Sequence, residues 1–201
     1  MTAHASDEDL LRRMLGGCAE SFAALYDRRQ AGVYRFALRM TGSEAFAEDV
    51  TQDVFLALVR EGCQFDPERG TVRSYLYGMA RHRVLRRLER ERAHVPIEDE
   101  DGGEAEELPS AADDPFADLA RDELVELVRQ AVLSLPAHFR EVIVLCHLQE
   151  LNYAEAAEVV SCPVGTVRSR LARAREMLTG KLRALRGPSA DKSLVKAGRA
   201  I

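Results

Sequence analysis

The sequence has no tryptophan, and phenylalanine and tyrosine together supply only 6% of its 201 residues, so any core must be mainly aliphatic. It also has no long apolar run. Its apolar runs, such as Val142 to Cys146, are far shorter than the roughly 20 apolar residues of a membrane-spanning helix. The first residues, "MTAHASDEDLL", are acidic and lack the apolar centre of a secretion signal. We therefore expect a cytoplasmic protein that does not insert into a membrane.

Patterns that hold metals or carry out catalysis are also missing. No two cysteines form a Cys-x-x-Cys pair, and none has a histidine at zinc-site spacing. The sequence contains no glycine-rich phosphate loop and no recognisable nucleophile–histidine pair. We expect no catalytic residue, no metal, no cofactor and no enzymatic activity. The four cysteines, which we interpret as reduced structural thiols, are Cys18, Cys63, Cys146 and Cys162.

The net charge of −5 conceals an uneven distribution. Six arginines lie between Arg81 and Arg92, and seven basic residues lie between Arg168 and Arg186. The segment from His94 to Asp118 contains ten acids and no lysine or arginine. The sequence therefore has two basic regions separated by an acidic segment, which contributes most of the negative balance.

Apolar residues recur at helical spacing on both sides of this acidic segment, and no segment of useful length alternates as a strand would. Alanine, leucine, arginine and glutamate dominate, which favours helix. We predict an all-α protein with two small helical domains, 1–92 and 121–186. An acidic flexible linker, 93–120, joins them, and 187–201 forms a flexible tail.

The C-terminal basic region follows a helix-turn-helix pattern. A short helix, "NYAEAAEVV", is followed by the turn "SCP" and then by "VGTVRSRLARAR". Val167 and Leu171 are four residues apart and should face the core, which leaves a basic face outward. That face suits the major groove of DNA, although an ordinary surface helix with solvated arginines is the alternative. The predicted DNA-contacting residues are Val164, Gly165, Thr166, Arg168, Ser169, Arg170 and Arg173.

Taken together, these segments resemble the extracytoplasmic-function sigma factors, a small two-domain branch of the bacterial RNA polymerase sigma factors. Residues Leu135 to Leu178, "LPAHFREVIVLCHLQELNYAEAAEVVSCPVGTVRSRLARAREML", resemble sigma region four. Residues from about Phe22 to Arg90 resemble region two through "ALYDRR", "AEDVTQDVFLAL" and "FDPERGTVRSYLYGMARHR". The resemblance implies a protein that binds core RNA polymerase, directs it to promoter DNA and helps to open that DNA. It also implies an anti-sigma factor as a partner.

One face of the predicted helix from Glu44 to Arg60 is a candidate polymerase-binding surface. Its members recur at helical spacing and form an acidic, polar face with one leucine, suited to a basic coiled coil. In the family, the matching segment binds the clamp helices of the largest polymerase subunit. The alternative is a solvated face. The residues concerned are Asp49, Gln52, Asp53 and Leu56.

The loop from Cys63 to Thr71 and the following helix match the part of the family that captures the unpaired upstream promoter strand. Aromatic rings there can stack on bases, and arginines can screen phosphates. The loop is also a candidate pocket for a flipped base. The alternative for the three aromatic residues is that they belong to the hydrophobic core. The candidate residues are Phe65, Arg73, Tyr75, Tyr77, Arg81, His82 and Arg83.

Other classes of protein remain as alternatives. A conventional helix-turn-helix regulator would bind its operator without polymerase, and a helical adaptor would not depend on the C-terminal arginines. For a sigma factor, the acidic linker should lower the affinity of the free protein for random DNA, because that affinity follows local positive charge. The linker is also a candidate to fold back on the basic helices until polymerase separates them.

Overall fold

The computed structural model describes residues 5–94 and 115–186, and within them the regular elements are all helices. The predicted all-α class is therefore confirmed. Within the same ranges, no helix is both long and apolar enough to span a bilayer. The elements are α1 (Asp7–Leu15), α2 (Ala19–Thr41), α3 (Glu44–Glu61), the 3₁₀-helix η1 (Gly62–Gln64), α4 (Val72–His94), α5 (Pro115–Leu133), α6 (Ala137–Ile143), the π-helix η2 (Val144–Leu148), α7 (Tyr153–Val160) and α8 (Val164–Arg186).

Local signals set the helix ends in the N-terminal domain, α1–α4. The Ser6 hydroxyl accepts a hydrogen bond from the Asp9 amide at 3.1 Å and caps α1. At the end of α2, Gly42 adopts the left-handed conformation, with φ of 75°. Ser43 then caps α3 by accepting from the Phe46 amide at 3.3 Å. The starts of α1 and α3 and the end of α2 therefore depend on residues that are adjacent in the sequence.

The helix-turn-helix in the C-terminal domain, α5–α8, is formed as the sequence predicts. Asn152 and Glu155 make a capping box at the start of α7. Ser161 ends α7 in the left-handed conformation, with φ of 55°, and α8 begins after Pro163. Val167 and Leu171 are buried, at 0% and 2% exposure, as their spacing predicts.

The helices extend further toward the linker than the sequence indicated. α4 continues to His94, and α5 begins at Pro115, inside the segment assigned to the linker. Proline is compatible with the first position of a helix, so a helix can begin at Pro115. The rest of the predicted linker and the predicted tail lie outside the described residues.

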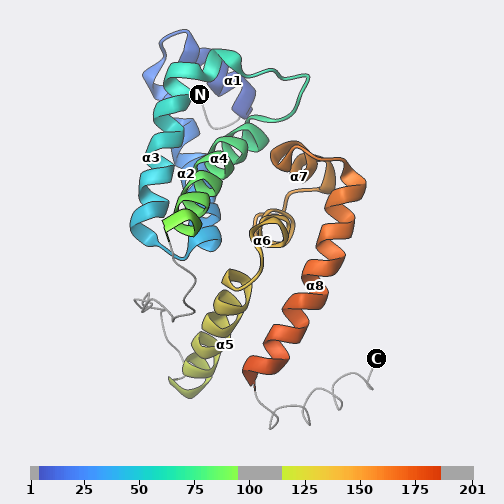
Figure 1. The fold of residues 1–201 in the computed structure, drawn as a ribbon. Coiled ribbons are helices and arrows are strands. Elements are labelled where there is room, and N and C mark those ends of the chain that lie inside the picture. The colour runs from blue at the N-terminus through green and yellow to red at the C-terminus, as the bar shows by residue number, and fades with distance from the viewer. Residues whose placement is uncertain (1–4, 95–114, 187–201) are drawn as a thin grey trace, which may run out of the picture.

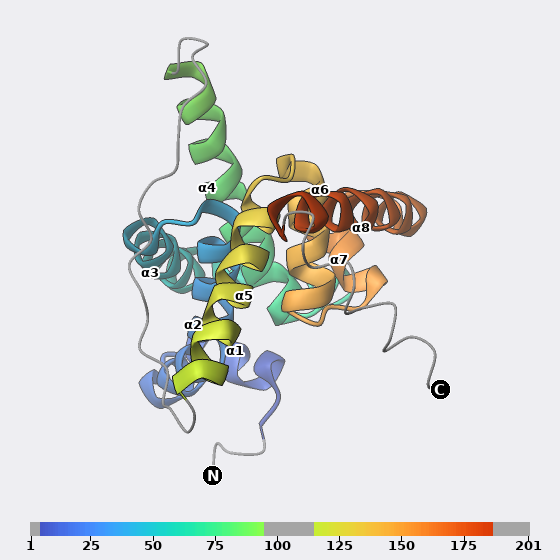
Figure 2. The same ribbon diagram turned by 90° about the horizontal axis from the view of Figure 1, so that it is seen from below.

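The two domains pack directly against each other. α7 lies beside α4, while α5 and η2 lie against α2 (Figures 1 and 2). The Arg39 guanidinium on α2 donates to the Leu148 carbonyl of η2 at 2.8 Å. Buried apolar residues of both domains form one continuous cluster. Surfaces of the N-terminal domain that face α7 and η2 are consequently covered.

Candidate nucleic-acid interface

The first two turns of α8 present a basic outer face. Val167, Leu171 and Ala174 are buried on the inner side. On the outer side, Arg168 and Arg173 are exposed, and the Arg168 guanidinium lies over the Tyr153 ring at 5.7 Å. Stacking of this kind orients a guanidinium without neutralising its charge. Of the other predicted DNA-contacting residues, Gly165 and Ser169 are exposed, and Val164 and Thr166 are partly exposed.

Arg170 forms an ion pair with a buried carboxylate of the protein. Its guanidinium donates to Glu141 Oε1 at 3.3 Å. Glu141 is only 1% exposed and also accepts from Arg81 Nε of α4 at 2.7 Å. A buried carboxylate needs such partners, because desolvation of an unpaired charge is costly. Sequence reasoning missed Glu141, because its position in an apolar helix gives no sign of a distant arginine.

The acidic face of α3 is open. Asp49, Gln52, Asp53 and Leu56 are all exposed, although residues between them are buried. Leu56 and Val59 are 47% and 53% exposed, so an apolar pair lies within the polar face. Val59 was not singled out from the sequence; its exposure depends on how α3 packs. Such a mixed acidic and apolar surface suits a partner that is basic and partly apolar.

Asp53 and Arg83 connect this face to α4. The Arg83 Nε atom lies 3.6 Å from Asp53 Oδ2, and Arg83 also donates to the Asp53 carbonyl at 3.1 Å. Two residues predicted for different partners therefore contact each other.

Part of the predicted single-strand surface remains fully or partly accessible to solvent in this arrangement. The rings of Phe65 and Tyr75 are partly buried and lie 5.6 Å apart, joining the loop to α4. Burial raises the pKa of the Tyr75 hydroxyl, which therefore stays protonated at neutral pH. His82, further along α4, is exposed.

The remainder of that surface lies under the C-terminal domain. Tyr77 is 5% exposed, and its hydroxyl donates to Gln149 Oε1 at 2.9 Å. Burial raises the pKa of this hydroxyl. Arg73 donates to the Gln149 carbonyl, and Arg81 pairs with Glu141. In this packing Tyr77 thus occupies the core, the alternative considered for it, and Arg73 and Arg81 bind protein groups.

The residues that the structure describes contain no grouping of histidine, cysteine, aspartate and glutamate suited to a metal ion. All four cysteines are free thiols. Burial raises the pKa of the Cys146 thiol, which keeps it protonated and unreactive at neutral pH.

Comparison with known proteins agrees with this division of the chain. The family model for sigma-70 region 2 matches residues 25–94, and the model for sigma-70 region 4 matches residues 126–178. The extracytoplasmic-function (ECF) RNA polymerase sigma factor SigK of Mycolicibacterium vanbaalenii is 33% identical over 164 residues, covering 81% of this chain and 82% of the relative. The ECF RNA polymerase sigma-E factor of Escherichia coli is 32% identical over 192 residues, covering 92% of this chain and 98% of the relative.

A solved structure of CnrH in complex with the cytosolic domain of CnrY has a TM-score of 0.67 and 27% identity, and covers 90% of this chain and 99% of that one. The two-domain helical fold, its helix-turn-helix and the matches to sigma-70 regions 2 and 4 together assign the chain to the class of sigma factors. The chain belongs to the extracytoplasmic-function family of RNA polymerase sigma factors. Such proteins bind core RNA polymerase and direct it to promoter DNA, and they are transcription initiation factors, not enzymes.

Proposed function

We propose that three surfaces of this chain divide the work of promoter-directed initiation. The exposed face of α3 binds core polymerase, the outer face of α8 reads the upstream promoter element, and the loop before α4 with α4 itself captures the melted strand. The chain catalyses no reaction of its own and acts in the cytoplasm, where it meets polymerase.

The observation that carries this proposal is the outer face of α8. Its buried side holds the helix against α6 and α7, while Arg168, Ser169 and Arg173 extend outward. A helix held in this way fits the major groove, with its N-terminal residues near base edges and later arginines near phosphates. Arg170, which pairs with Glu141, helps to fix the helix at the angle it presents.

The packing of the domains suggests an order of events. The α3 face is open in this structure, whereas Tyr77, Arg73 and Arg81 are engaged by the C-terminal domain. Polymerase therefore binds first at α3. The C-terminal domain then moves away from α4 and frees the strand-binding residues. Because the contacts that must break include a buried ion pair, separation of the domains requires binding energy from the polymerase.

Run-off transcription with purified core polymerase on a library of promoter fragments tests the proposal. We expect transcripts from a subset of promoters only when this chain is present, and a relaxed preference at one base pair of the upstream element in Arg168→Ala. A conventional helix-turn-helix regulator would instead protect its operator from cleavage without polymerase. Such protection by the chain alone, with no polymerase-dependent transcript, would overturn the proposal.

A regulatory polypeptide of the anti-sigma type is a further proposed partner. CnrH, to which this chain is similar, was solved in complex with the cytosolic domain of CnrY. We expect such a polypeptide to compete with core polymerase for this chain, and competition between the two in a pull-down tests it.

A further inference from the structure

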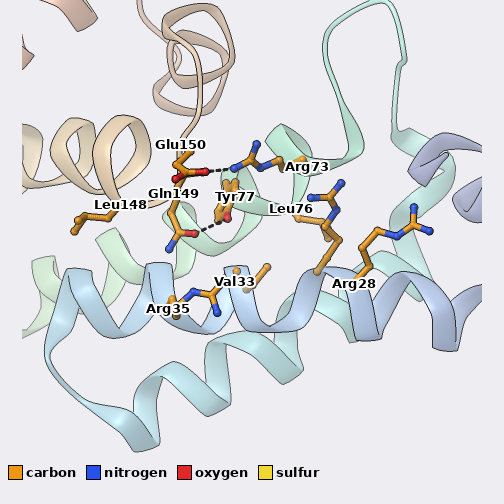
Figure 3. Close-up of a pocket in the computed structure, with 11 residues that line it drawn as sticks. Arg28, Val33, Arg35, Arg73, Leu76, Tyr77, Leu148, Gln149 and Glu150 are labelled. Carbon is orange, nitrogen blue, oxygen red and sulfur yellow. Dashed lines mark hydrogen bonds between the residues drawn. The ribbon is translucent and has the colours of Figure 1, made fainter. Parts of the chain in front are cut away.

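A cavity of about 300 Å³ lies where the two domains meet, between α2, α4 and the segment that follows η2 (Figure 3). Four arginines line it: Arg28, Arg29 and Arg35 from α2, and Arg73 from α4. Gln149 and Glu150 close it from the C-terminal domain, and Val33 and Leu76 contribute apolar wall. The cavity is therefore strongly cationic and exists only while the domains are packed together.

Two of these arginines already have carboxylate partners, and two do not. Arg28 and Arg29 both pair with the buried carboxylate of Asp7. Arg73 donates to the Gln149 carbonyl and lies over the Tyr77 ring at 5.9 Å. Within residues 5–94 and 115–186, no carboxylate pairs with Arg73 or with Arg35. Among the described residues that line the cavity, Glu150 is the one acidic side chain, so positive charge is in excess there.

This charge is felt by neighbouring groups. The pKa of the Arg39 guanidinium is lowered, first by burial and then by the charge of Arg35. Burial raises the pKa of Tyr77, but Arg73, Arg35 and Arg29 all act in the opposite direction. Three guanidinium groups of the lining thus act on the pKa of one buried hydroxyl, in agreement with their positions around the cavity.

An unsatisfied donor lies at the same place. Gln149 is 5% exposed, and its Oε1 atom accepts from the Tyr77 hydroxyl. Its Nε2 atom is buried and has no hydrogen-bond partner. Leaving such a donor unpaired is costly, and buried amides in folded proteins nearly always have an acceptor. Residues 5–94 and 115–186 provide none for this donor, so the side chain is suited to an acceptor that a ligand brings.

We infer that this cavity binds a terminal phosphate group of a small molecule, held by Arg35 and Arg73 and by the amide of Gln149. Guanidinium groups match phosphate oxygens in geometry and charge, and the group presents the acceptor that Gln149 lacks. The volume lies at the lower limit of small-molecule sites, which fits a compact ligand rather than a continuous nucleic-acid strand. Since both domains contribute donors, the bound phosphate holds the C-terminal domain against α4.

Calorimetric titration of the full chain with pyrophosphate, at constant ionic strength, tests the inference. We expect saturable binding by the wild-type protein. Arg35→Ala should weaken it about tenfold or more, since it removes a charge-assisted contact. Arg35 is an exposed side chain, so this variant should keep its fold, which circular dichroism can verify. Arg13→Ala is the matched control, because Arg13 is an exposed arginine of α1 and does not line the cavity.

Gln149→Glu provides a second, nearly isosteric test. It keeps an oxygen to accept from Tyr77 and replaces the unpaired donor by a negatively charged acceptor. We expect pyrophosphate binding to be abolished. Dimethyl phosphate, which mimics the nucleic-acid backbone and has no terminal phosphate, should bind at least tenfold more weakly than pyrophosphate.

Absence of binding by the wild-type protein would overturn the inference, as would binding that both variants retain. Equal affinity for dimethyl phosphate would instead identify a nucleic-acid backbone site and would overturn the assignment to a small molecule. The assays contain neither polymerase nor promoter, so their outcome is separate from that of the transcription experiment.

Discussion

Arg81 of α4 and Glu141 of α6 form an ion pair with an Nε–Oε2 distance of 2.7 Å, although they are 60 residues apart in the sequence. Glu141 is buried, and its other oxygen accepts from Arg170 of α8. One carboxylate thus connects the helix predicted to hold the melted strand with the helix predicted to read duplex DNA. Separation of the two domains must break the contact with Arg81 but can leave the contact with Arg170 intact.

Arg81→Ala should therefore loosen the packing of the two domains. We expect the free energy of unfolding to fall by about 1–2 kcal/mol, because Glu141 keeps Arg170 as a partner. Small-angle X-ray scattering should show a larger radius of gyration. Arg86→Ala is the control, because Arg86 is an exposed arginine on the same helix. If Arg81→Ala matches the wild type in both measurements, the ion pair does not hold the domains together.

Asp49→Lys should weaken binding to core polymerase about tenfold or more, corresponding to at least about 1.4 kcal/mol. Asp49 is exposed and belongs to the acidic face, whereas Asp53 also contacts Arg83 and would give a mixed effect. Fluorescence anisotropy with labelled protein measures the affinity. Glu48→Lys makes the same charge change about 100° around the helix and serves as the control. Equal affinities for the two variants would remove this face from the polymerase-binding surface.

Arg168 and Arg173 should have separable roles in reading the promoter. Arg168 lies in the first turns of α8, which we propose to be near the base edges. Arg168→Ala should therefore reduce the free energy of promoter binding by about 1–3 kcal/mol and relax the preference at one base pair. Arg173→Ala should weaken binding to all promoter sequences alike and reduce the slope of log affinity against log salt concentration by about one, as expected for a phosphate contact. Transcription from promoters mutated one base at a time measures both effects.

Arg183→Ala is the matched control for these two variants, because Arg183 is an exposed arginine further along α8. Wild-type behaviour of both Arg168→Ala and Arg173→Ala on every promoter would mean that the basic face is only a solvated surface. Arg170→Ala should behave differently from both, because loss of its contact with Glu141 lowers stability as well as DNA binding.

Gly42→Ala should destabilise the protein by about 1–2 kcal/mol, because a left-handed backbone is unfavourable for residues with a Cβ atom. Gly42 has φ of 75°, and an added Cβ would lie 2.9 Å from Leu133 Cδ1 of the C-terminal domain. At Gly180 on α8, an added Cβ would meet no atom within 4 Å. Gly180→Ala should therefore stabilise the protein by up to about 1 kcal/mol, because alanine favours a helix more than glycine does. Urea unfolding of the two variants compares them. Equal stabilities would show that the turn after α2 does not require glycine.

Replacement of the ten acids between His94 and Asp118 by serine and asparagine should raise the affinity of the free protein for random duplex DNA. The effect should be largest at low salt, where phosphate contacts are least screened. Electrophoretic mobility shift at several salt concentrations measures it. An unchanged affinity would mean that the acids do not shield the basic helices.

Much of the fold followed from local signals in the sequence. The caps at Ser6, Ser43 and Asn152 and the left-handed Gly42 mark helix ends within a few residues, so their chemistry acts without help from distant parts. The spacing of Val167 and Leu171 likewise predicted which side of α8 is buried. The helix ends next to the linker were harder to predict, because acidic residues such as those in 93–120 suit a solvated chain and the first turns of a helix equally well.

The sequence by itself determined the helices, the two domains, the helix-turn-helix and the family, because these depend on periodicity and on residues close together in the chain. Only the tertiary structure decided which candidate side chains remain free. Tyr77, Arg73 and Arg81 meet Gln149 and Glu141 across a domain interface that no local pattern describes. The physical reason is that charge and hydrogen-bond partners are set by distance in space, and these partners come from helices far apart in the chain.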